Sequence, residues 1–548
     1  MPYVGRDQYY EEPLAQPSAM WTDMYELTMA QALFLDGRHE QQTTFQAFVR
    51  KVPFGAAYMI SAGQNIIYEW LDKNWKFTER DLYRLSEETV VHPTTGETVP
   101  VYTPEFLEFL RTSKLEISLE AMPEGEIAFA GEPVFKITGP VWQAMLVETA
   151  ILNAMNSQSL IATLASIIKT AANQKPVIEG GARRSQSVGA LSSSRAAFIG
   201  GVDATSNYWA RTNYGIPAKG TMAHAYIMFH DTELDAFRNW SKYMSHMPTY
   251  LPDTYDSVNG IKNIITAVTE AGIVPAGARH DSDDLAHYSN LGRAAFDSIG
   301  ATKAINVVSN GLGPKTINSL EQQTQNINAY LVGTDLVTSA DQPALGGVYK
   351  IAAKYDQALS HEEIRALKAA VKEGRVDPKD IRDRVTDLMK LSNETVKMTY
   401  PGELDSIRYL EEKDGELRMI SGTICSDWVK DPITLEDPAD RFSGRLNRDI
   451  MSVLPTNTIL SKTFNAGARA YRPIVPVLQE GTLVGDIETV QLAQARAKRG
   501  LAMLDASHKR LLNPHIFYVG VEESLLTRQG AMGRRLKERA DTVYANKI

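Results

Sequence analysis

Between residues 177 and 350, short apolar runs alternate with polar, glycine-rich clusters, and the pattern repeats eight times. The clusters read EGGARRSQ, GGVDATSN, KGTMAHA, DTYDSVNG, GARHDSDD, SNGLG, VGTD and VYK. Helical patterns lie between some of them, at 257–271, 284–299 and 315–326. A strand, a polar turn and a helix form the repeating unit of a β/α barrel, and the turns after the strands build its mouth. The pattern therefore predicts a β/α barrel over residues 175–352.

The segment before the barrel mixes helical and strand patterns. An amphipathic helix is predicted over 21–35, beginning near Thr22 or Asp23. A longer helix is predicted over 142–174, with a break near Asn156. Strand signals lie at 43–50 and 115–137. We therefore expect residues 1–174 to form an N-terminal α/β domain whose last helix leads into the barrel.

The sequence after the barrel changes character twice. A highly charged run at 359–390 opens with a capping box, Ser360 and Glu363, and predicts a solvated surface insertion within a helical linker, 353–399. Strand signals return at 406–424, and residues 485–540 are mostly helical in pattern. We expect residues 400–548 to form a C-terminal extension, with strands returning to the N-terminal domain and then helices. The overall fold class is α/β.

Composition narrows the function classes. The chain has 548 residues, too many for one core, and a net charge of −9. That charge argues against broad binding to nucleic acid or an anionic membrane. Cys425 is the only cysteine, which excludes an intramolecular disulfide and fits a cytoplasmic protein. No run of 18 apolar residues is present, so we expect a soluble protein with neither a membrane nor a nucleic-acid partner.

Two arginines and a histidine follow glycines in the barrel region. Arg183 and Arg184 come after a Gly-Gly pair, and guanidinium groups bind carboxylates and phosphates bidentately. A structural ion pair is the alternative. His224 follows Lys219-Gly220-Thr221 and suits a nucleophile or an acid/base. No HxH or HExxH spacing is nearby, which argues against a histidine metal triad, and a structural role remains the alternative.

Carboxylates follow two of the predicted strands. Asp253 opens Asp-Thr-Tyr-Asp, and Asp281 opens Asp-Ser-Asp-Asp. Carboxylates on separate elements can hold Mg²⁺ through water or bind the vicinal hydroxyls of a ribose. Asp is also an ordinary helix N-cap, and we expect that role for some of them, for example Asp256 or Asp284.

Short glycine turns, Asn310-Gly311 and Gly333-Thr334, stand late in the barrel region. Loops after the last barrel strands often bind phosphate through backbone N–H groups. Lys350 would reach the same phosphate or lie on the surface. Together, these candidates suit an anionic, phosphorylated sugar with Mg²⁺.

A series of motifs runs in one order along nearly the whole chain. They are Thr22-Asp23-x-Tyr25-Glu26-Leu27-Thr28, Phe48-x-Arg50-x-x-Pro53, Pro123-Glu124-Gly125, Arg183-Arg184, Lys219-Gly220-Thr221-x-x-His224, Leu251-x-Asp253-Thr254-Tyr255, Arg279-x-Asp281-Ser282, Ser309-Asn310-Gly311, Val332-Gly333-Thr334, Tyr400-Pro401-Gly402 and Asn513-Pro514-His515. In this order the chain resembles the nicotinate phosphoribosyltransferase family.

The resemblance implies a reaction and a fold. The implied fold is an N-terminal α/β domain, an irregular β/α barrel and a C-terminal extension. Nicotinate attacks C1 of phosphoribosyl pyrophosphate (PRPP), and pyrophosphate leaves. The family couples this to ATP hydrolysis through a phosphorylated histidine, here His224, uses Mg²⁺, serves NAD biosynthesis, and is a homodimer with shared active sites. The implied catalytic residues are His224, Asp253, Asp281 and Arg279, with Asp253 and Asp281 as Mg²⁺ candidates. The implied substrate-binding residues are Tyr25, Arg183, Arg184, Asp203, Thr221, Asn310, Gly311, Gly333, Thr334 and Lys350.

Two alternatives stay open at this point. The first is a nicotinamide phosphoribosyltransferase, since the two families share most motifs. The second is a non-catalytic homologue that keeps the fold. Two positions depart from the family pattern: Gly180 stands where a bulky residue is frequent, and Asp283 stands where glycine is common.

Overall fold

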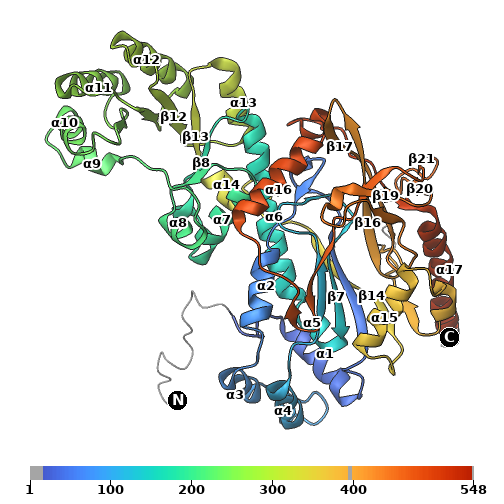
Figure 1. Cartoon of the computed structure of the whole chain (residues 1–548). Coiled ribbons are helices and arrows are strands. Elements are labelled where there is room, and N and C mark those ends of the chain that lie inside the picture. Colours follow the sequence, from blue (N-terminus) through green and yellow to red (C-terminus); the bar gives the residue numbers. More distant parts are fainter. Residues whose placement is uncertain (1–16, 393–397, 546–548) are drawn as a thin grey trace.

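The computed structural model describes residues 17–392 and 398–545; residues 1–16, predicted from the sequence to be a loose arm, lie outside the described residues. Two sheets and their helices form a broad body, and a smaller domain of parallel strands projects from it (Figure 1). Helix α6 (Glu148–Ala171) runs from the body into this smaller domain. The predicted α/β class, with an N-terminal domain, an irregular β/α barrel and a C-terminal extension, is confirmed.

The N-terminal domain is built on a seven-stranded antiparallel sheet, in the order β15-β14-β1-β7-β5-β23-β24. Its strands are β1 (Gln42–Val49), β5 (Ser118–Ala121), β7 (Pro133–Pro140), β14 (Gly347–Tyr355), β15 (Val385–Asp387), β23 (Val475–Gln479) and β24 (Thr482–Leu483). Two small sheets pair β2 (Met59–Ile60) with β6 (Ile127–Ala128) and β3 (Thr89–Val91) with β4 (Thr98–Pro100). Chain segments before and after the barrel therefore meet in one sheet.

The helices of this domain are α1 (Met24–Leu35), α2 (Gln64–Lys73), α3 (Glu79–Glu87), α4 (Pro104–Thr112), α5 (Val141–Leu146) and α6. Of the two N-caps that the sequence predicts for α1, Thr22 and Asp23, the structure has Asp23. The helix predicted over 142–174 is interrupted at Val147, between α5 and α6, whereas Asn156 lies inside α6; the break predicted at Asn156 is wrong. The run Val141–Ala171 is long and apolar enough to cross a membrane, but 72% of its most apolar window is buried inside the protein, as in a core helix.

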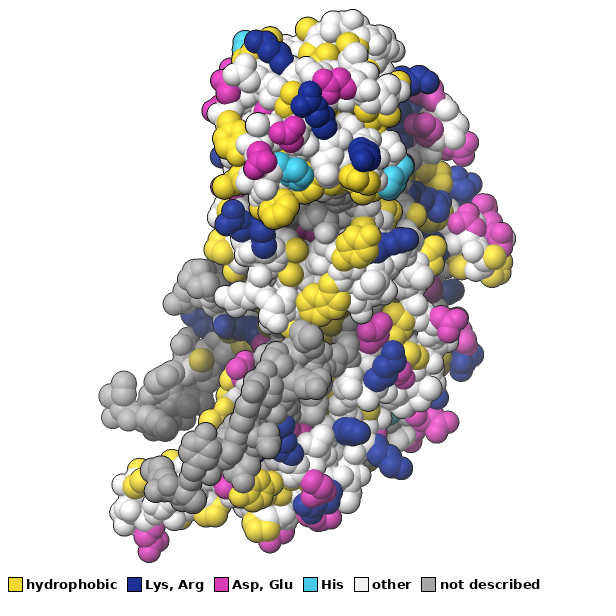
Figure 2. Space-filling model, turned by 90° about the vertical axis from the view of Figure 1, so that its left-hand side faces the viewer, with side chains coloured by type: hydrophobic (Ala, Val, Ile, Leu, Met, Phe, Trp, Pro, Cys, Tyr) yellow, Lys and Arg dark blue, Asp and Glu magenta, His cyan; other side chains and the backbone are white. Residues whose placement is uncertain are grey.

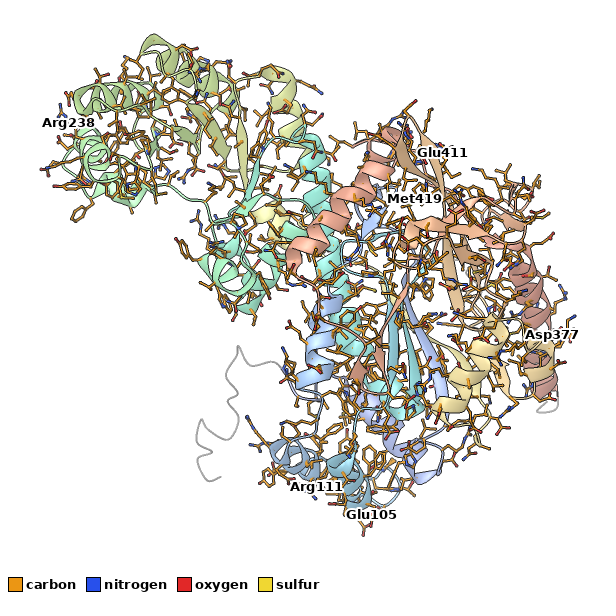
Figure 3. The ribbon with its side chains drawn as sticks, viewed as in Figure 1. Glu105, Arg111, Arg238, Asp377, Glu411 and Met419 are labelled. Carbon is orange, nitrogen blue, oxygen red and sulfur yellow. The ribbon has the colours of Figure 1, made fainter. Side chains whose placement is uncertain are left out.

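The projecting domain is a parallel half-barrel. Its sheet has six strands in the order β10-β11-β12-β13-β8-β9, and β9 does not pair with β10 among the described residues. The strands are β8 (Val177–Glu179), β9 (Ala204–Thr205), β10 (Thr249–Tyr250), β11 (Gly277–His280), β12 (Ile305–Ser309) and β13 (Ala329–Val332). Its helices are α7 (Val188–Ile199), α8 (Tyr208–Tyr214), α9 (His224–Met228), α10 (Glu233–Tyr243), α11 (Ser257–Ala271), α12 (Leu285–Ser298), α13 (Pro314–Gln323) and α14 (Thr334–Thr338). Helix α10 is tied to α11 by Arg238, labelled in Figure 3, which binds both carboxylate oxygens of Glu270 at 2.7 and 2.9 Å.

Two of the eight predicted strand ends do not belong to this sheet. The Lys219–Ala225 cluster follows an isolated bridge between Thr205 and Ala218 and no full strand. The Val348–Lys350 cluster lies in β14, which pairs antiparallel with β1 in the other sheet. Short apolar runs look alike in both settings, because pairing partners are chosen over long sequence distances.

The C-terminal extension forms an eight-stranded mixed sheet, in the order β18-β19-β22-β16-β17-β25-β20-β21. Its strands are β16 (Leu404–Lys413), β17 (Glu416–Ser426), β18 (Ile433–Leu435), β19 (Gly444–Leu446), β20 (Ile450–Val453), β21 (Ser461–Phe464), β22 (Arg469–Tyr471) and β25 (Val519–Glu522). Helices α16 (Val490–Met503) and α17 (Glu523–Ala545) flank β25 in the chain. The sequence predicts this stretch to be mostly helical and misses β25, which pairs parallel with β17.

The charged run at 359–390 is packed against the N-terminal sheet and the C-terminal sheet. Helix α15 (His361–Lys372) buries Ile364 and Val371 in an apolar cluster with Trp428. The ammonium groups of Lys368 and Lys372 lie 2.5 and 2.8 Å from the fully buried carboxylate of Asp427. The interpretation of this run as a solvated surface insertion is therefore wrong, although its capping box at Ser360 is present and its outer turn at Asp377 is exposed (Figure 3).

Candidate active site

The site begins at the adjacent ends of β10 and β11. These strands run parallel, with Thr249 paired to Gly277, so the residues after them emerge at the same edge of the sheet. Asp253 Oδ2 accepts hydrogen bonds from the backbone N–H of Asp281 at 2.8 Å and from the hydroxyl of Ser282 at 2.7 Å. Asp253 Oδ1 is buried and has no hydrogen-bond partner among the described residues. One oxygen of Asp253 thus positions the neighbouring loop, and the other is free to bind a ligand.

Asp281 links this loop to the histidine. Its Oδ1 accepts a hydrogen bond from the Ser309 hydroxyl at the end of β12, and its Oδ2 lies 3.8 Å from Nε2 of His224. The other ring nitrogen, Nδ1, lies 3.1 Å from the hydroxyl of Thr254. When Nδ1 donates to Thr254, Nε2 carries a lone pair beside Asp281, which is the arrangement that a nucleophilic imidazole requires.

Arg279 points into the same region from β11. Its Nη1 donates to the Thr221 hydroxyl at 3.3 Å, while its buried Nε has no partner among the described residues. Burial lowers the pKa of Arg279, Asp281 and Asp253 oppose that effect, and the positive charge of Arg183 adds to it. The structure thus places Arg183 within electrostatic range of Arg279, the other predicted anion-binding group.

The Arg183-Arg184 pair lies in a single turn of 3-10 helix, Ala182–Arg184, directly after β8. Both side chains are exposed, and neither forms an ion pair with a residue in 17–392 or 398–545. A structural ion pair, the alternative suggested by the sequence, is therefore not found in the described part of the chain. Two unpaired guanidinium groups are available to an anion.

The glycine turns lie together beside this loop. Gly180 donates its N–H to Val332 O at 2.8 Å, and a Cβ on Gly181 would lie 2.9 Å from Gly333 O. A Cβ on Gly313, just past Asn310-Gly311, would lie 2.7 Å from Asp335 Oδ2, just past Gly333-Thr334. Asn310 and Gly311 have φ angles of 77° and 60°, in the left-handed region that glycine and asparagine tolerate best. Backbone N–H groups of the β8, β12 and β13 turns are thus gathered at one edge.

Three of the predicted substrate-binding residues, Asp203, Lys350 and Tyr25, lie away from the strand-end residues of the half-barrel. Asp203 precedes β9 and accepts hydrogen bonds from Lys169 Nζ and from the backbone N–H of Val177, both at 2.8 Å. Val177 opens β8, so Asp203 stands at the opposite end of the sheet from the mouth, in a structural ion pair. Lys350 lies on β14, where its Nζ donates to Tyr349 O at 2.5 Å.

Tyr25 stands in the first turn of α1 and is half-exposed. It lines a cavity of about 400 Å³ together with residues of α6 and the segment 343–345, including Glu148, Thr149 and Asn156. Burial, followed by the carboxylates of Glu148, Glu26 and Asp23, raises the pKa of Tyr25 to about 12. None of the strand-end residues of the half-barrel lines this cavity.

The comparisons with known proteins agree over nearly the whole chain. Models of the nicotinate phosphoribosyltransferase N-terminal and C-terminal domains match residues 20–156 and 428–529. The nicotinate phosphoribosyltransferase of Bacillus subtilis is 31% identical over 511 residues, which cover 92% of this chain and 93% of that protein. This chain belongs to the nicotinate phosphoribosyltransferase family.

More distant members of the family agree. The Caenorhabditis elegans nicotinate phosphoribosyltransferase is 29% identical over 587 residues, covering 96% of this chain and 94% of that protein. The crystal structure of human nicotinic acid phosphoribosyltransferase superposes with a TM-score of 0.70 at 23% identity, covering 93% of this chain and 99% of that one. At that identity the likeness supports the fold.

The two departures from the family pattern have local explanations. Asp283 adopts a φ of 61°, a conformation that glycine reaches freely and that Asp tolerates better than most residues. Its side chain is exposed. At Gly180, a Cβ would lie 2.6 Å from Cδ2 of Leu331, so Leu331 fills the space that a larger residue would take.

Three hydroxyl residues of the site, Thr254, Ser282 and Ser309, stand in the motif series, but the sequence interpretation assigned them no role. Each stands beside a chosen residue in a strand-end cluster, and that position was the signal that could have singled them out. Their hydrogen bonds to His224, Asp253 and Asp281 align the charged side chains.

Asp253 and Asp281 are the candidate ligands of Mg²⁺. Within the described residues, no group of three or more His, Cys, Asp or Glu side chains could hold a metal ion by itself. Mg²⁺ in phosphate-handling sites uses one or two carboxylates together with waters and substrate phosphates. The unpartnered buried Asp253 Oδ1 and the nearby Asp281 carboxylate fit that requirement.

Proposed function

We propose that this protein is a cytoplasmic nicotinate phosphoribosyltransferase that forms nicotinate mononucleotide from nicotinate and PRPP in NAD biosynthesis, coupled to ATP hydrolysis. The observation that carries the proposal is the convergence of His224, Asp253, Asp281 and Arg279 in a chain that belongs to this family. Two exposed arginines and three glycine turns beside them suit the anionic groups of the substrates.

The transfer needs positioning and charge stabilisation more than covalent help. The pyridine nitrogen of nicotinate donates its electron pair to C1 of PRPP, while the C1–O bond breaks and its electrons leave with pyrophosphate. Positive charge grows on the ribose, and the Asp281 carboxylate would stabilise it while binding the ribose hydroxyls. Arg183 and Arg279 would bind the nicotinate carboxylate or the phosphates, and the turns at Gly311 and Gly333 would hold the 5′-phosphate.

The coupling step is assigned to His224. Its Nε2 would attack the γ-phosphorus of ATP, the bond to ADP would break, and water would later release phosphate and restore the imidazole. Asp253 and Asp281 would hold Mg²⁺, which neutralises phosphate charge when bound. The Thr254 hydroxyl, 3.1 Å from Nδ1, would keep the ring oriented during attack.

A turnover assay with PRPP and ATP tests the proposal, with nicotinate and nicotinamide supplied in parallel. We expect nicotinate mononucleotide, pyrophosphate, ADP and phosphate from the nicotinate reaction and little product from nicotinamide. Preferential use of nicotinamide would favour the amide-specific alternative. No product from either base would favour a non-catalytic homologue.

His224→Ala is expected to abolish both ATP hydrolysis and the stimulation of synthesis by ATP. A slow, ATP-independent formation of nicotinate mononucleotide should survive, because Arg279, Asp253 and Asp281 still position PRPP. Wild-type enzyme incubated with γ-labelled ATP should carry acid-labile, base-stable label on His224. Absence of label, together with intact ATP coupling in the alanine variant, would contradict the assignment.

Tyr25 is proposed to act across a homodimer interface by stacking on the pyridine ring in the second subunit's site. The barrel domain has exposed apolar side chains that a second subunit would cover, among them Tyr208, Phe229 and Tyr255, and the upper part of Figure 2 shows apolar side chains at the surface of this domain. Tyr25→Ala should weaken nicotinate binding more than PRPP binding, because only the ring contact is lost. Calorimetric titration of each substrate measures the difference, and Tyr25→Phe, which keeps the ring, is the control. Equal losses for both substrates would argue against stacking.

A further inference from the structure

Glu179, the last residue of β8, is a fully buried carboxylate that none of the steps above uses. It accepts hydrogen bonds from three directions: the backbone N–H of Gly181, the Ser194 hydroxyl of α7 at 2.7 Å and the Thr205 hydroxyl of β9 at 2.6 Å. Its two oxygens therefore tie together two neighbouring strand ends and the helix between them.

Both segments held by Glu179 lead directly to site residues. Gly181 opens the turn that carries Arg183 and Arg184. Thr205 donates its N–H to Pro217 O and accepts from the Lys219 N–H, both at 2.9 Å, which anchors the start of the loop that carries Thr221 and His224. By contrast, Asp253 and Asp281, which follow β10 and β11, are fixed to each other, and in the described part of the chain no hydrogen bond joins either side chain to Glu179.

The surroundings of Glu179 differ from those of other buried carboxylates in this protein. Glu124 pairs with Arg195 and Glu132 with Arg408, whereas Glu179 forms no ion pair with any residue that the structure describes. A buried carboxylate without a cation is costly, and only charge-assisted hydrogen bonds offset that cost. Glu179 has no ion pair that could replace these three hydrogen bonds, so the geometry around its carboxylate is well defined.

We propose that Glu179 is a positioning residue that sets the spacing between the Arg183-Arg184 turn and the His224 loop. The proposal rests on the proposed function, because it assigns the first segment to anion binding and the second to ATP coupling. A correct spacing lets the phosphorylated histidine act while nicotinate and PRPP are bound. Loss of the spacing uncouples the two half-reactions without removing any group that touches a substrate.

Glu179→Gln tests this with little change in shape. An amide carries no charge and has one acceptor oxygen in place of two, so either the Gly181 N–H loses its acceptor or the Ser194 and Thr205 hydroxyls must turn to accept from the amide. We expect kcat/KM for nicotinate to fall by about 100-fold, the effect of a misplacement near 1 Å. We also expect more ATP to be hydrolysed per nicotinate mononucleotide formed. A merely structural residue would lower the amount of active enzyme and leave that ratio and KM unchanged.

Glu321→Gln is the matched control. Glu321 is also a buried carboxylate of the half-barrel, held by Tyr330, by Lys175 at 2.6 Å and by Asn173 at 2.9 Å, at the end of the sheet away from the mouth. Its replacement should lower the thermal unfolding temperature and leave the coupling ratio at the wild-type value. Equal changes in the coupling ratio for both variants would overturn the proposal.

Hydrogen–deuterium exchange gives an answer that does not depend on turnover. In Glu179→Gln, the backbone amides of residues 181–189 and 217–224 should exchange faster than in wild type, while those of 277–284 should not change. If Glu179→Gln does not fold, Thr205→Val removes a single donor and should produce the same pattern in weaker form. Wild-type exchange and wild-type coupling in both variants would refute the role of Glu179, whereas an inactive wild type with the expected exchange would refute only the proposed function.

Discussion

Asp281→Asn is expected to lower kcat/KM by roughly 100- to 1,000-fold, the loss seen when a preorganised electrostatic group is removed from a transition state. The variant keeps the size of the side chain but removes the negative charge that faces growing positive charge on the ribose. It also removes the carboxylate that lies 3.8 Å from His224 Nε2 and accepts a hydrogen bond from Ser309. Steady-state kinetics with nicotinate and PRPP measure the effect.

Asp284→Asn in the same loop is the matched control. Asp284 caps α12, where its carboxylate accepts the His287 N–H at 3.0 Å, and asparagine caps a helix equally well. Both variants remove one negative charge within four residues of each other, so a loss confined to Asp281→Asn is due to its position. A wild-type kcat/KM in Asp281→Asn would show that ribose binding and charge stabilisation lie elsewhere.

Local patterns in the sequence predicted several helices, and they predicted some of the residues that the structure brings together at the candidate site. Helix α11 spans 257–271 as predicted, because its amphipathic period and its cap, Asp256, are both local features. The N-cap of α12, Asp284, was likewise predicted from local sequence. Arg279, Asp253 and Asp281 were found because parallel strands end at one edge, so residues after successive strands meet there.

What the sequence could not predict depends on contacts between distant segments. Lys350 follows an apolar run like the barrel strands do, but β14 pairs with β1, roughly 300 positions earlier in the chain. Asp203 belongs to a correctly recognised cluster, yet it precedes β9 instead of following it, and this small shift moves it to the wrong end of the sheet. Strand β25 is only Val519–Glu522, too short for its periodicity to stand out between two helices.

The charged run at 359–390 was assigned to the surface for the same reason: its partners lie far along the chain. Its lysines read as solvated in the sequence because the carboxylate that binds them, Asp427, lies far along the chain. Burial would raise the pKa of Asp427, but Lys136, Lys368 and Lys372 lower it well below its usual value. A carboxylate held ionised in the interior requires its cations, so the run is part of the folded core.

Replacement of residues 359–390 by a short Gly/Ser linker is therefore expected to prevent folding into a soluble protein. The change removes β15 from the edge of the N-terminal sheet, exposes the apolar cluster around Trp428, removes two of the ammonium partners of Asp427, and leaves the buried Glu403 carboxylate without Lys368. Leaving one buried charge without its partner costs about 3–5 kcal/mol, a large part of the stability of an ordinary domain. Soluble yield and circular dichroism report the outcome, and a folded, active deletion variant would contradict it.

A single substitution isolates the electrostatic part of this effect. Lys368→Met keeps the length and apolar stem of the side chain but removes the ammonium group, which lies 2.5 Å from Asp427 and 2.8 Å from Glu403. The free energy of unfolding should fall by about 3–5 kcal/mol, as expected when one partner of a buried ion pair is removed. Lys379→Met, at an exposed position in the same run, should leave it nearly unchanged. Equal unfolding midpoints in denaturant for the two variants would mean that the buried charges contribute no more than surface ones, and that the apolar contacts of α15 alone hold the run in place.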